Sequence, residues 1–221
     1  MHCKALVFDA YGTIFDVHAV AARCESLWPD RGAAVSQFWR SKQLEYTWQR
    51  SLMQRYRDFR VVTEESLRYV CDALKLPCTE PDIASLLEEY LRLATFPEVP
   101  EALKPLGNKK LAILSNGSPA MLEPLVKNAG LESTFAAVLS VDSVKVYKPD
   151  PRAYELAEKT LGIAAKDIGF VSSNCWDACG AKSYGFNVFW INRAGAPVDG
   201  LGERPDFLLG NLAELPSLLG V

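Results

Sequence analysis

Short apolar runs alternate with segments of helical pattern along this chain, and this alternation limits the possible folds more than any other feature. Runs this short and this continuously apolar are typical of strands buried on both faces, as in a parallel sheet. Strand and helix in turn predict an α/β fold built on an open sheet. The predicted strands are residues 5–8, 111–115, 136–141, 168–173, 186–191 and 206–210.

Two of the helical segments carry recognisable end signals. Residues 118–130 and 150–162 each start on a polar residue followed by proline and stop at a glycine, which is the order expected at the two ends of a helix. We assign Ser118, Asp150 and Asp167 as capping residues rather than as parts of a site.

Residues 17–97 interrupt the alternation, because they contain no strand-like run and several amphipathic patterns. An all-helical segment lodged after the first strand predicts an inserted cap domain able to cover the carboxyl end of that strand. The predicted division is an α/β core domain of residues 1–16 and 98–221 and a helical cap domain of residues 17–97. The amphipathic patterns lie at residues 20–29, 35–56, 63–76 and 81–93.

Charge and composition exclude several classes of partner. With a formal net charge of -3 at pH 7, the 221-residue chain gives no electrostatic reason to bind nucleic acid or an anionic membrane surface. No apolar stretch reaches the roughly eighteen residues that cross a bilayer, and no signal peptide is visible, so we expect a cytoplasmic protein. The six cysteines form no CxxC pair and no metal-binding pattern with histidine, so free and mostly buried thiols are expected.

Polar side chains gather where the predicted strands end. In open α/β sheets, ligands bind outside the carboxyl ends of the strands. One acid such as Asp9 could simply be a turn former, but four clusters are much harder to explain as turns and caps. The clusters contain Asp9, Tyr11 and Thr13; Ser115 and Asn116; Lys148; and Ser172, Ser173, Asn174 and Asp177.

These clusters give the chain a strong resemblance to the haloacid dehalogenase superfamily and, within it, to the L-2-haloacid dehalogenases. The matching segments cover nearly the whole chain and stand in the family's order. The resemblance implies a Rossmann-like core with a helical cap. The segments are FDAYGTIFD, FWRSKQLEYTW, LSNGSP, KVYKPDPRAYELA and FVSSNCWDACGAKSYGF.

The implied activity is hydrolytic dehalogenation of (S)-2-haloalkanoic acids to (R)-2-hydroxyalkanoic acids and halide, through an aspartyl ester on Asp9. A small-molecule phosphatase of the same superfamily is the alternative, and a non-catalytic binding protein is a third reading. Phosphatases of the superfamily carry a second aspartate two positions after the nucleophile, to protonate the departing alkoxide, and this chain has Tyr11 there. A halide leaves without a proton, so the dehalogenase is favoured.

The resemblance also assigns roles to individual residues. Arg40 would receive the departing halide, although an arginine on an amphipathic helix is usually a solvated surface residue. Tyr154 is as well suited to holding Lys148 as to chemistry. The implied catalytic residues are Asp9, Thr13, Arg40, Ser115, Lys148, Tyr154, Ser172, Asn174 and Asp177. The implied substrate-binding residues are Tyr11, Arg40, Leu44, Phe59, Ser115, Asn116 and Trp176, although an aromatic or leucine side chain among them could be plain core packing.

The expected partners are a small 2-haloalkanoate and water, with no cofactor, no metal, no nucleic acid and no membrane. With Asp9 and Asp177 as the core acids, and Lys148 and Arg40 as bases, the formal charge of the site is about zero, which leaves a magnesium ion few hard ligands. A homodimer is expected from the family, and the long helix around Trp39 to Tyr56 offers apolar surface, although the sequence assigns no interface.

Overall fold

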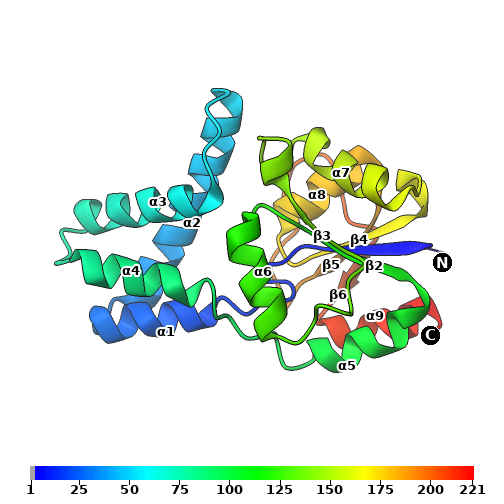
Figure 1. Ribbon diagram of the computed structural model, residues 1–221, viewed down its shortest axis with the longest axis horizontal. Helices are drawn as coiled ribbons and strands as arrows, with labels where there is room; N and C mark the ends of the chain where they lie inside the picture. Colours follow the sequence, from blue (N-terminus) through cyan, green and yellow to red (C-terminus); the bar gives the residue numbers. More distant parts are fainter. Residues whose placement is uncertain (1–2) are drawn as a thin grey trace.

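The computed structural model describes residues 3–221 of the chain. Within these residues, six strands form one sheet in the order β3-β2-β1-β4-β5-β6, and every neighbouring pair is parallel (Figure 1). Each strand falls on a run predicted from the sequence, so the α/β open-sheet prediction is confirmed. The strands are β1 (Ala5–Phe8), β2 (Lys110–Ser115), β3 (Ala137–Ser140), β4 (Ile168–Ser172), β5 (Asn187–Ile191) and β6 (Phe207–Leu209).

The first strand lies in the middle of the sheet, between β2 and β4, and is buried along its whole length. Phe8, its last residue, is level with Ile113 of β2 and Val171 of β4. The next residue, Asp9, therefore emerges at the centre of the carboxyl edge, where loops from both neighbouring strands can reach it.

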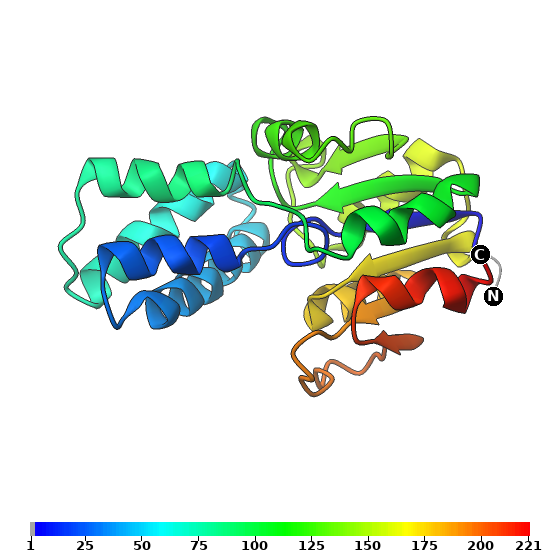
Figure 2. The same cartoon turned by 90° about the horizontal axis from the view of Figure 1, so that it is seen from below.

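Helices cover both faces of the sheet. In Figures 1 and 2, α5 (Val99–Leu103) and α9 (Leu215–Leu219) lie on one face, while α7 (Pro151–Leu161) and α8 (Cys175–Tyr184) lie on the other. The remaining helix of this part, α6 (Pro119–Asn128), connects β2 to β3. Short 3-10 turns occupy Lys104–Asn108, Val141–Ser143, Ala165–Asp167 and Leu212–Glu214.

The three predicted capping residues have different outcomes. Asp150 is confirmed as the N-cap of α7, because its carboxylate accepts the N–H of Arg152. Ser118 occupies the N-cap position of α6 but makes no capping hydrogen bond. The prediction for Asp167 is wrong: this residue ends a 3-10 turn before β4, and its carboxylate pairs with Lys4. This ion pair joins segments that are distant in the sequence.

Four helices lie between β1 and α5 and pack against one another beside the sheet, on the left of Figures 1 and 2. The longest, α2, ends at Leu52 rather than at residue 56, because Gln54 turns left-handed (φ 55°) and the N–H of Arg55 closes on the carbonyl of Arg50. The four are α1 (His18–Leu27), α2 (Gly32–Leu52), α3 (Phe59–Ala73) and α4 (Glu80–Glu89).

The two connections between the sheet and this helical segment run side by side and are joined by backbone hydrogen bonds. Asp16 donates its N–H to the carbonyl of Ala94, and Phe96 donates its N–H to the carbonyl of Ile14.

All six cysteines are free, and four of them, Cys3, Cys24, Cys71 and Cys179, are buried, as expected. In the part of the chain that the structure describes, no helix has the length and apolarity needed to span a bilayer.

Candidate active site

Asp9 is the centre of a buried polar cluster at the carboxyl edge of the sheet. Its N–H still donates to Val171 of β4 (2.9 Å), so the backbone is fixed by the sheet up to this residue. Its Oδ2 accepts hydrogen bonds from Asn174 Nδ2 (2.8 Å) and Thr13 Oγ1 (3.2 Å), while its Oδ1 accepts one from Lys148 Nζ (3.0 Å). Only 6% of the residue surface is exposed. The two oxygens therefore have unequal numbers of donors.

Lys148 lies between two carboxylates. Its ammonium contacts Asp9 and, at 2.8 Å, Asp177 Oδ2, and it is almost completely buried. Its backbone N–H donates to Asn116 Oδ1 (3.0 Å), which ties the loop after β2 to the loop before α7. Burial alone would lower the pKa of Lys148, but the charges of Asp177 and Asp9 outweigh it and raise the pKa above its usual value. The side chain is a permanent cation.

Asp177 forms the far end of this arrangement and is fully buried. Besides Lys148, it accepts hydrogen bonds from Tyr154 Oη (2.8 Å) and Ser172 Oγ (3.0 Å). Burial raises the pKa of Asp177 to about 6; the charge of Asp9 adds to the shift, and Lys148 opposes it. Asp177 therefore changes protonation state just below neutral pH, which suits a group that handles protons.

The turn from β4 into α8 positions three of these side chains together. Asn174 is the N-cap of α8, and its N–H donates to Ser172 Oγ (3.1 Å). Asp177 follows in the first turn of the helix, where the helix dipole favours a negative charge. One local segment thus supplies a donor to each carboxylate.

Aromatic side chains cover the cluster. The ring of Tyr11 lies 5.9 Å from that of Phe59 and 5.8 Å from that of Tyr90, both from the helical segment. Its hydroxyl is buried without a hydrogen-bond partner among residues 3–221. Burial raises the pKa of Tyr11, with Tyr90 adding to the shift and the charge of Arg40 opposing it. Tyr90 has no signal in the sequence that separates it from core packing.

Arg40 lies on α2 and is half-buried rather than fully exposed. Its Nη1 donates to Gln43 Oε1 (2.6 Å), and the Gln43 amide in turn donates to Thr63 Oγ1 (2.7 Å). Gln43 is completely buried. This support for the guanidinium was not predicted from the sequence, since a glutamine on an amphipathic helix usually faces solvent.

Three more predicted site residues, Ser115, Leu44 and Trp176, make no hydrogen bond to Asp9. Ser115 is buried and accepts the N–H of Gly117 (3.1 Å). Leu44 is half-buried on α2. Trp176 packs edge-to-face on Trp48 (5.5 Å) and lines an apolar cavity of about 460 Å³. Their predicted substrate contacts remain predictions.

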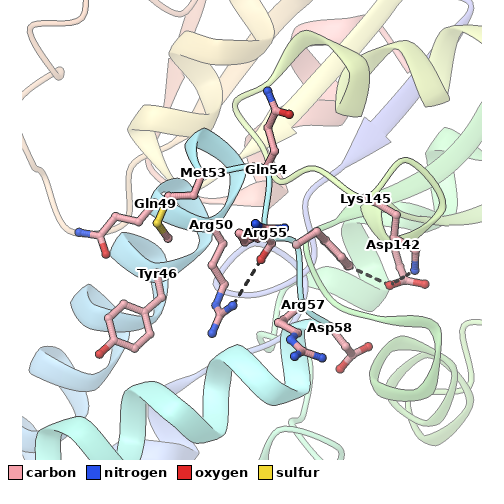
Figure 3. Close-up of a pocket in the computed structure, with 11 residues that line it drawn as sticks. Tyr46, Gln49, Arg50, Met53, Gln54, Arg55, Arg57, Asp58, Asp142 and Lys145 are labelled. Carbon is pink, nitrogen blue, oxygen red and sulfur yellow. Dashed lines mark hydrogen bonds and ion pairs between the residues drawn. The ribbon is translucent and has the colours of Figure 1, made fainter.

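A second cavity, of about 910 Å³, opens beside the end of α2 and carries a concentration of cationic side chains (Figure 3). Asp142 lines this cavity, where it pairs with Lys145 (2.8 Å) and accepts a hydrogen bond from the hydroxyl of Tyr56 (2.9 Å). The ring of Tyr56 lies 4.9 Å from that of Tyr147, the neighbour of Lys148, in a tilted arrangement. Asp9 does not line the cavity. The lining residues are Tyr46, Gln49, Arg50, Met53, Gln54, Arg55, Tyr56, Arg57, Asp58, Asp142 and Lys145.

The cluster contains two carboxylates with an ammonium between them. Residues 3–221 contain no group of three or more histidine, cysteine, aspartate or glutamate side chains arranged to hold a metal ion. A carboxylate held by three donors, next to a second carboxylate with a raised pKa, can act as a nucleophile supported by a base.

Comparisons with known proteins agree with this geometry. Residues 3–185 match the family model of haloacid dehalogenase-like hydrolases. The (S)-2-haloacid dehalogenase of Pseudomonas sp. (strain YL) is 49% identical over 98% of this chain and 94% of that protein.

Two solved structures are close matches. A crystal structure of an L-2-haloacid dehalogenase superposes with a TM-score of 0.98 at 46% identity, covering 100% of both chains. The L-2-haloacid dehalogenase of Xanthobacter autotrophicus with chloropropionic acid covalently bound superposes with a TM-score of 0.92 at 42% identity, covering 99% of this chain and 98% of that one. Sequence, sheet order and site thus lead to the same conclusion: this chain belongs to the haloacid dehalogenase-like hydrolases.

Proposed function

We propose that this chain is an (S)-2-haloacid dehalogenase, which hydrolyses (S)-2-haloalkanoic acids to (R)-2-hydroxyalkanoic acids and halide. The observation that carries the proposal is the environment of Asp9: a carboxylate with three donors, sharing Lys148 with Asp177. The names of the relatives support the substrate class, and the covalently bound chloropropionic acid in one of them supports an ester intermediate.

In the first step, an oxygen of Asp9 attacks C2 of the substrate from the side opposite the halogen. The carbon–oxygen bond forms as the carbon–halogen bond breaks, so the halide takes the electron pair and the configuration at C2 inverts. We assign the attack to Oδ1, which accepts one hydrogen bond, from Lys148, whereas Oδ2 accepts two. Asn174 and Thr13 hold Oδ2 and so fix the direction of attack.

In the second step, water attacks the carbonyl carbon of the ester and regenerates the Asp9 carboxylate. Asp177 accepts one proton of this water, directly or through Ser172. Asn174 and Thr13 stabilise the negative charge that develops on Oδ2, and Lys148 stabilises the charge on the departing oxygen, Oδ1. Tyr154 holds Asp177 in position through its hydroxyl. As the bond between the Asp9 acyl carbon and the substrate oxygen breaks, the proton held by Asp177 passes to the departing alkoxide and the Asp9 carboxyl releases its remaining proton to solvent. The hydroxy acid leaves with the oxygen that Asp9 supplied.

The substrate is held by three groups of residues in this proposal. Ser115 and Asn116 bind its carboxylate, and Arg40 faces the halogen. Tyr11, Leu44, Phe59 and Trp176 form the apolar wall around the reacting bond. A phosphate ester is a poorer substrate, because Tyr11 replaces the acid that would protonate its leaving group.

Halide release is the direct test of the function. We expect release from (S)-2-chloropropanoate in metal-free buffer with a chelator present, formation of (R)-lactate, and little release from the R enantiomer. The stereochemistry follows because a substrate pinned by its carboxylate shows Asp9 one face of C2. Retained configuration, or turnover that stops on chelation and returns with magnesium, would contradict the proposal and favour the phosphatase-like alternative.

The rate of ester hydrolysis is expected to fall as pH drops through about 6, because the pKa of Asp177 is raised to about 6 and the protonated acid cannot accept a proton from water. The alkylation step does not need this base. Mass spectrometry of acid-quenched enzyme should therefore show the ester on Asp9 accumulating at acidic pH. An ester fraction independent of pH between about 5 and 8 would remove Asp177 from this role.

Replacing Arg40 with lysine is expected to lower kcat/KM by about 10²-fold, because lysine lacks the planar fork that bonds Gln43 and faces the halogen together. The same change at Arg60, an exposed residue at the start of α3, is the matched control and should have no effect. If Arg40→Lys is as active as the control, Arg40 has no role in the reaction beyond packing.

The division into a core of residues 1–16 and 98–221 and a cap of residues 17–97 is part of this proposal, as are a cytoplasmic location and a homodimer. Within the helix around Trp39 to Tyr56, which was expected to offer apolar surface, Trp39 itself is fully buried and its indole donates to the carbonyl of Thr63 (2.8 Å). Leu52 and Met53, 84% and 60% exposed, are the available apolar side chains at that end of α2. Light scattering of the purified protein measures the assembly.

A further inference from the structure

A second arginine, Arg193, contacts the loop that carries the nucleophile. It follows β5 by two residues, and 22% of its side-chain surface is exposed. Its Nη1 donates to the carbonyl of Gly12 (3.0 Å) and its Nη2 to the carbonyl of Thr13 (3.1 Å). One guanidinium therefore bonds two carbonyls of the loop of residues 9–14, which we call the nucleophile loop.

The same guanidinium is itself held in place. Its Nε and Nη2 donate to Glu98 Oε1 (3.1 and 2.6 Å), and its central carbon lies 3.7 Å from the centre of the Phe96 ring. Both residues belong to the backbone that returns from the helical segment, and Phe96 is hydrogen-bonded to Ile14 of the nucleophile loop. Arg193 thus joins three segments that are far apart in the sequence.

The loop has little freedom of its own at this point. Gly12 adopts a left-handed conformation (φ 84°), and its carbonyl also accepts the hydroxyl of Ser173 (2.6 Å). The N–H of Ser173 donates to Thr13 Oγ1 (2.8 Å), and that hydroxyl donates to Asp9 Oδ2. Any shift of the Gly12 and Thr13 carbonyls therefore moves the donor that orients the Asp9 carboxylate.

We infer that Arg193 is a positioning residue for dehalogenation, holding the nucleophile loop so that Thr13 keeps Asp9 in line with the carbon–halogen bond. This inference rests on the proposed function. A planar fork is required because one group must serve two carbonyls and a carboxylate together, and lysine offers a single ammonium.

Arg193→Ala is expected to lower kcat for (S)-2-chloropropanoate by about tenfold to a hundredfold, the scale expected for small displacements of a reacting group. KM should stay within about threefold of the parent value, since the substrate contacts remain. Guanidinium chloride at a low, non-denaturing concentration should recover part of kcat by filling the space over Phe96. Sodium chloride at equal ionic strength should not.

Lys182→Met is the matched control, because Lys182 forms an ion pair of similar burial with Asp206 (2.7 Å; side chains 32% and 28% exposed) and contacts neither Asp9 nor its loop. We expect kcat of this variant to equal that of the parent. A kcat of Arg193→Ala equal to that of the parent overturns the inference. A loss of kcat that equals the loss of folded protein, and that guanidinium does not recover, overturns it as well.

Arg193→Lys decides the question if the alanine variant does not fold. Reduced kcat at unchanged melting temperature supports the inference, and parent-like kcat overturns it. The parent enzyme separates this test from that of the function: if the parent releases no halide, the proposed function has failed, whereas the inference fails only through the Arg193 variants of an active parent.

Discussion

Replacing Asp9 with asparagine is expected to abolish halide release, lowering kcat by about 10⁴-fold or more, the scale seen when a covalent nucleophile is removed. An amide has the same shape as the carboxylate but cannot displace a halide, and Lys148, Thr13 and Asn174 remain around it. The variant must be assayed fresh and checked by mass spectrometry, because deamidation of the new asparagine would regenerate the nucleophile.

Oxygen labelling tests the role of Asp9 more sharply than loss of activity does. In a single turnover with excess enzyme in ¹⁸O water, the label should enter the peptide that contains Asp9, and the first hydroxy acid should carry ¹⁶O. This follows because water attacks the acyl carbon of the ester, and the product oxygen comes from the carboxylate. Label in the first-turnover product, with an unlabelled Asp9 peptide, would make Asp9 a general base for direct attack by water.

Replacing Lys148 with methionine is expected to lower kcat by about 10³-fold, the upper end for losing one preorganised electrostatic donor. The change leaves the carboxylates of Asp9 and Asp177 buried without the ammonium between them. It should also lower the free energy of unfolding by about 3 to 5 kcal/mol, as expected when one partner of a buried ion pair is removed. Urea unfolding and halide release at pH 7 measure the two effects.

Lys182→Met is again the control, because it removes a half-buried ion pair outside the cluster. It should change the free energy of unfolding by at most about 1 kcal/mol and leave kcat unaffected. If Lys148→Met unfolds like the parent, the ammonium is not offsetting the burial of the two carboxylates. If its kcat is also unchanged, Lys148 takes no part in either chemical step.

The sequence was a good guide to the parts of the structure that depend on local pattern. The strands follow from short apolar runs, and the N-cap of α7 follows from Asp150 before a proline. The convergence of Asp9, Lys148, Asn174 and Asp177 could also be anticipated, because the carboxyl ends of parallel strands meet at one edge of the sheet.

Tertiary structure alone decided which side chains became partners. Ser118 has the position of a cap without the hydrogen bond, and the support of Arg40 by Gln43 depends on how α2 packs on α3. The contact of Arg193 with the nucleophile loop joins residues about 180 positions apart. Periodicity and turn chemistry encode where an element begins and which face it buries, whereas hydrogen bonds between distant side chains exist only after the sheet order brings their segments together.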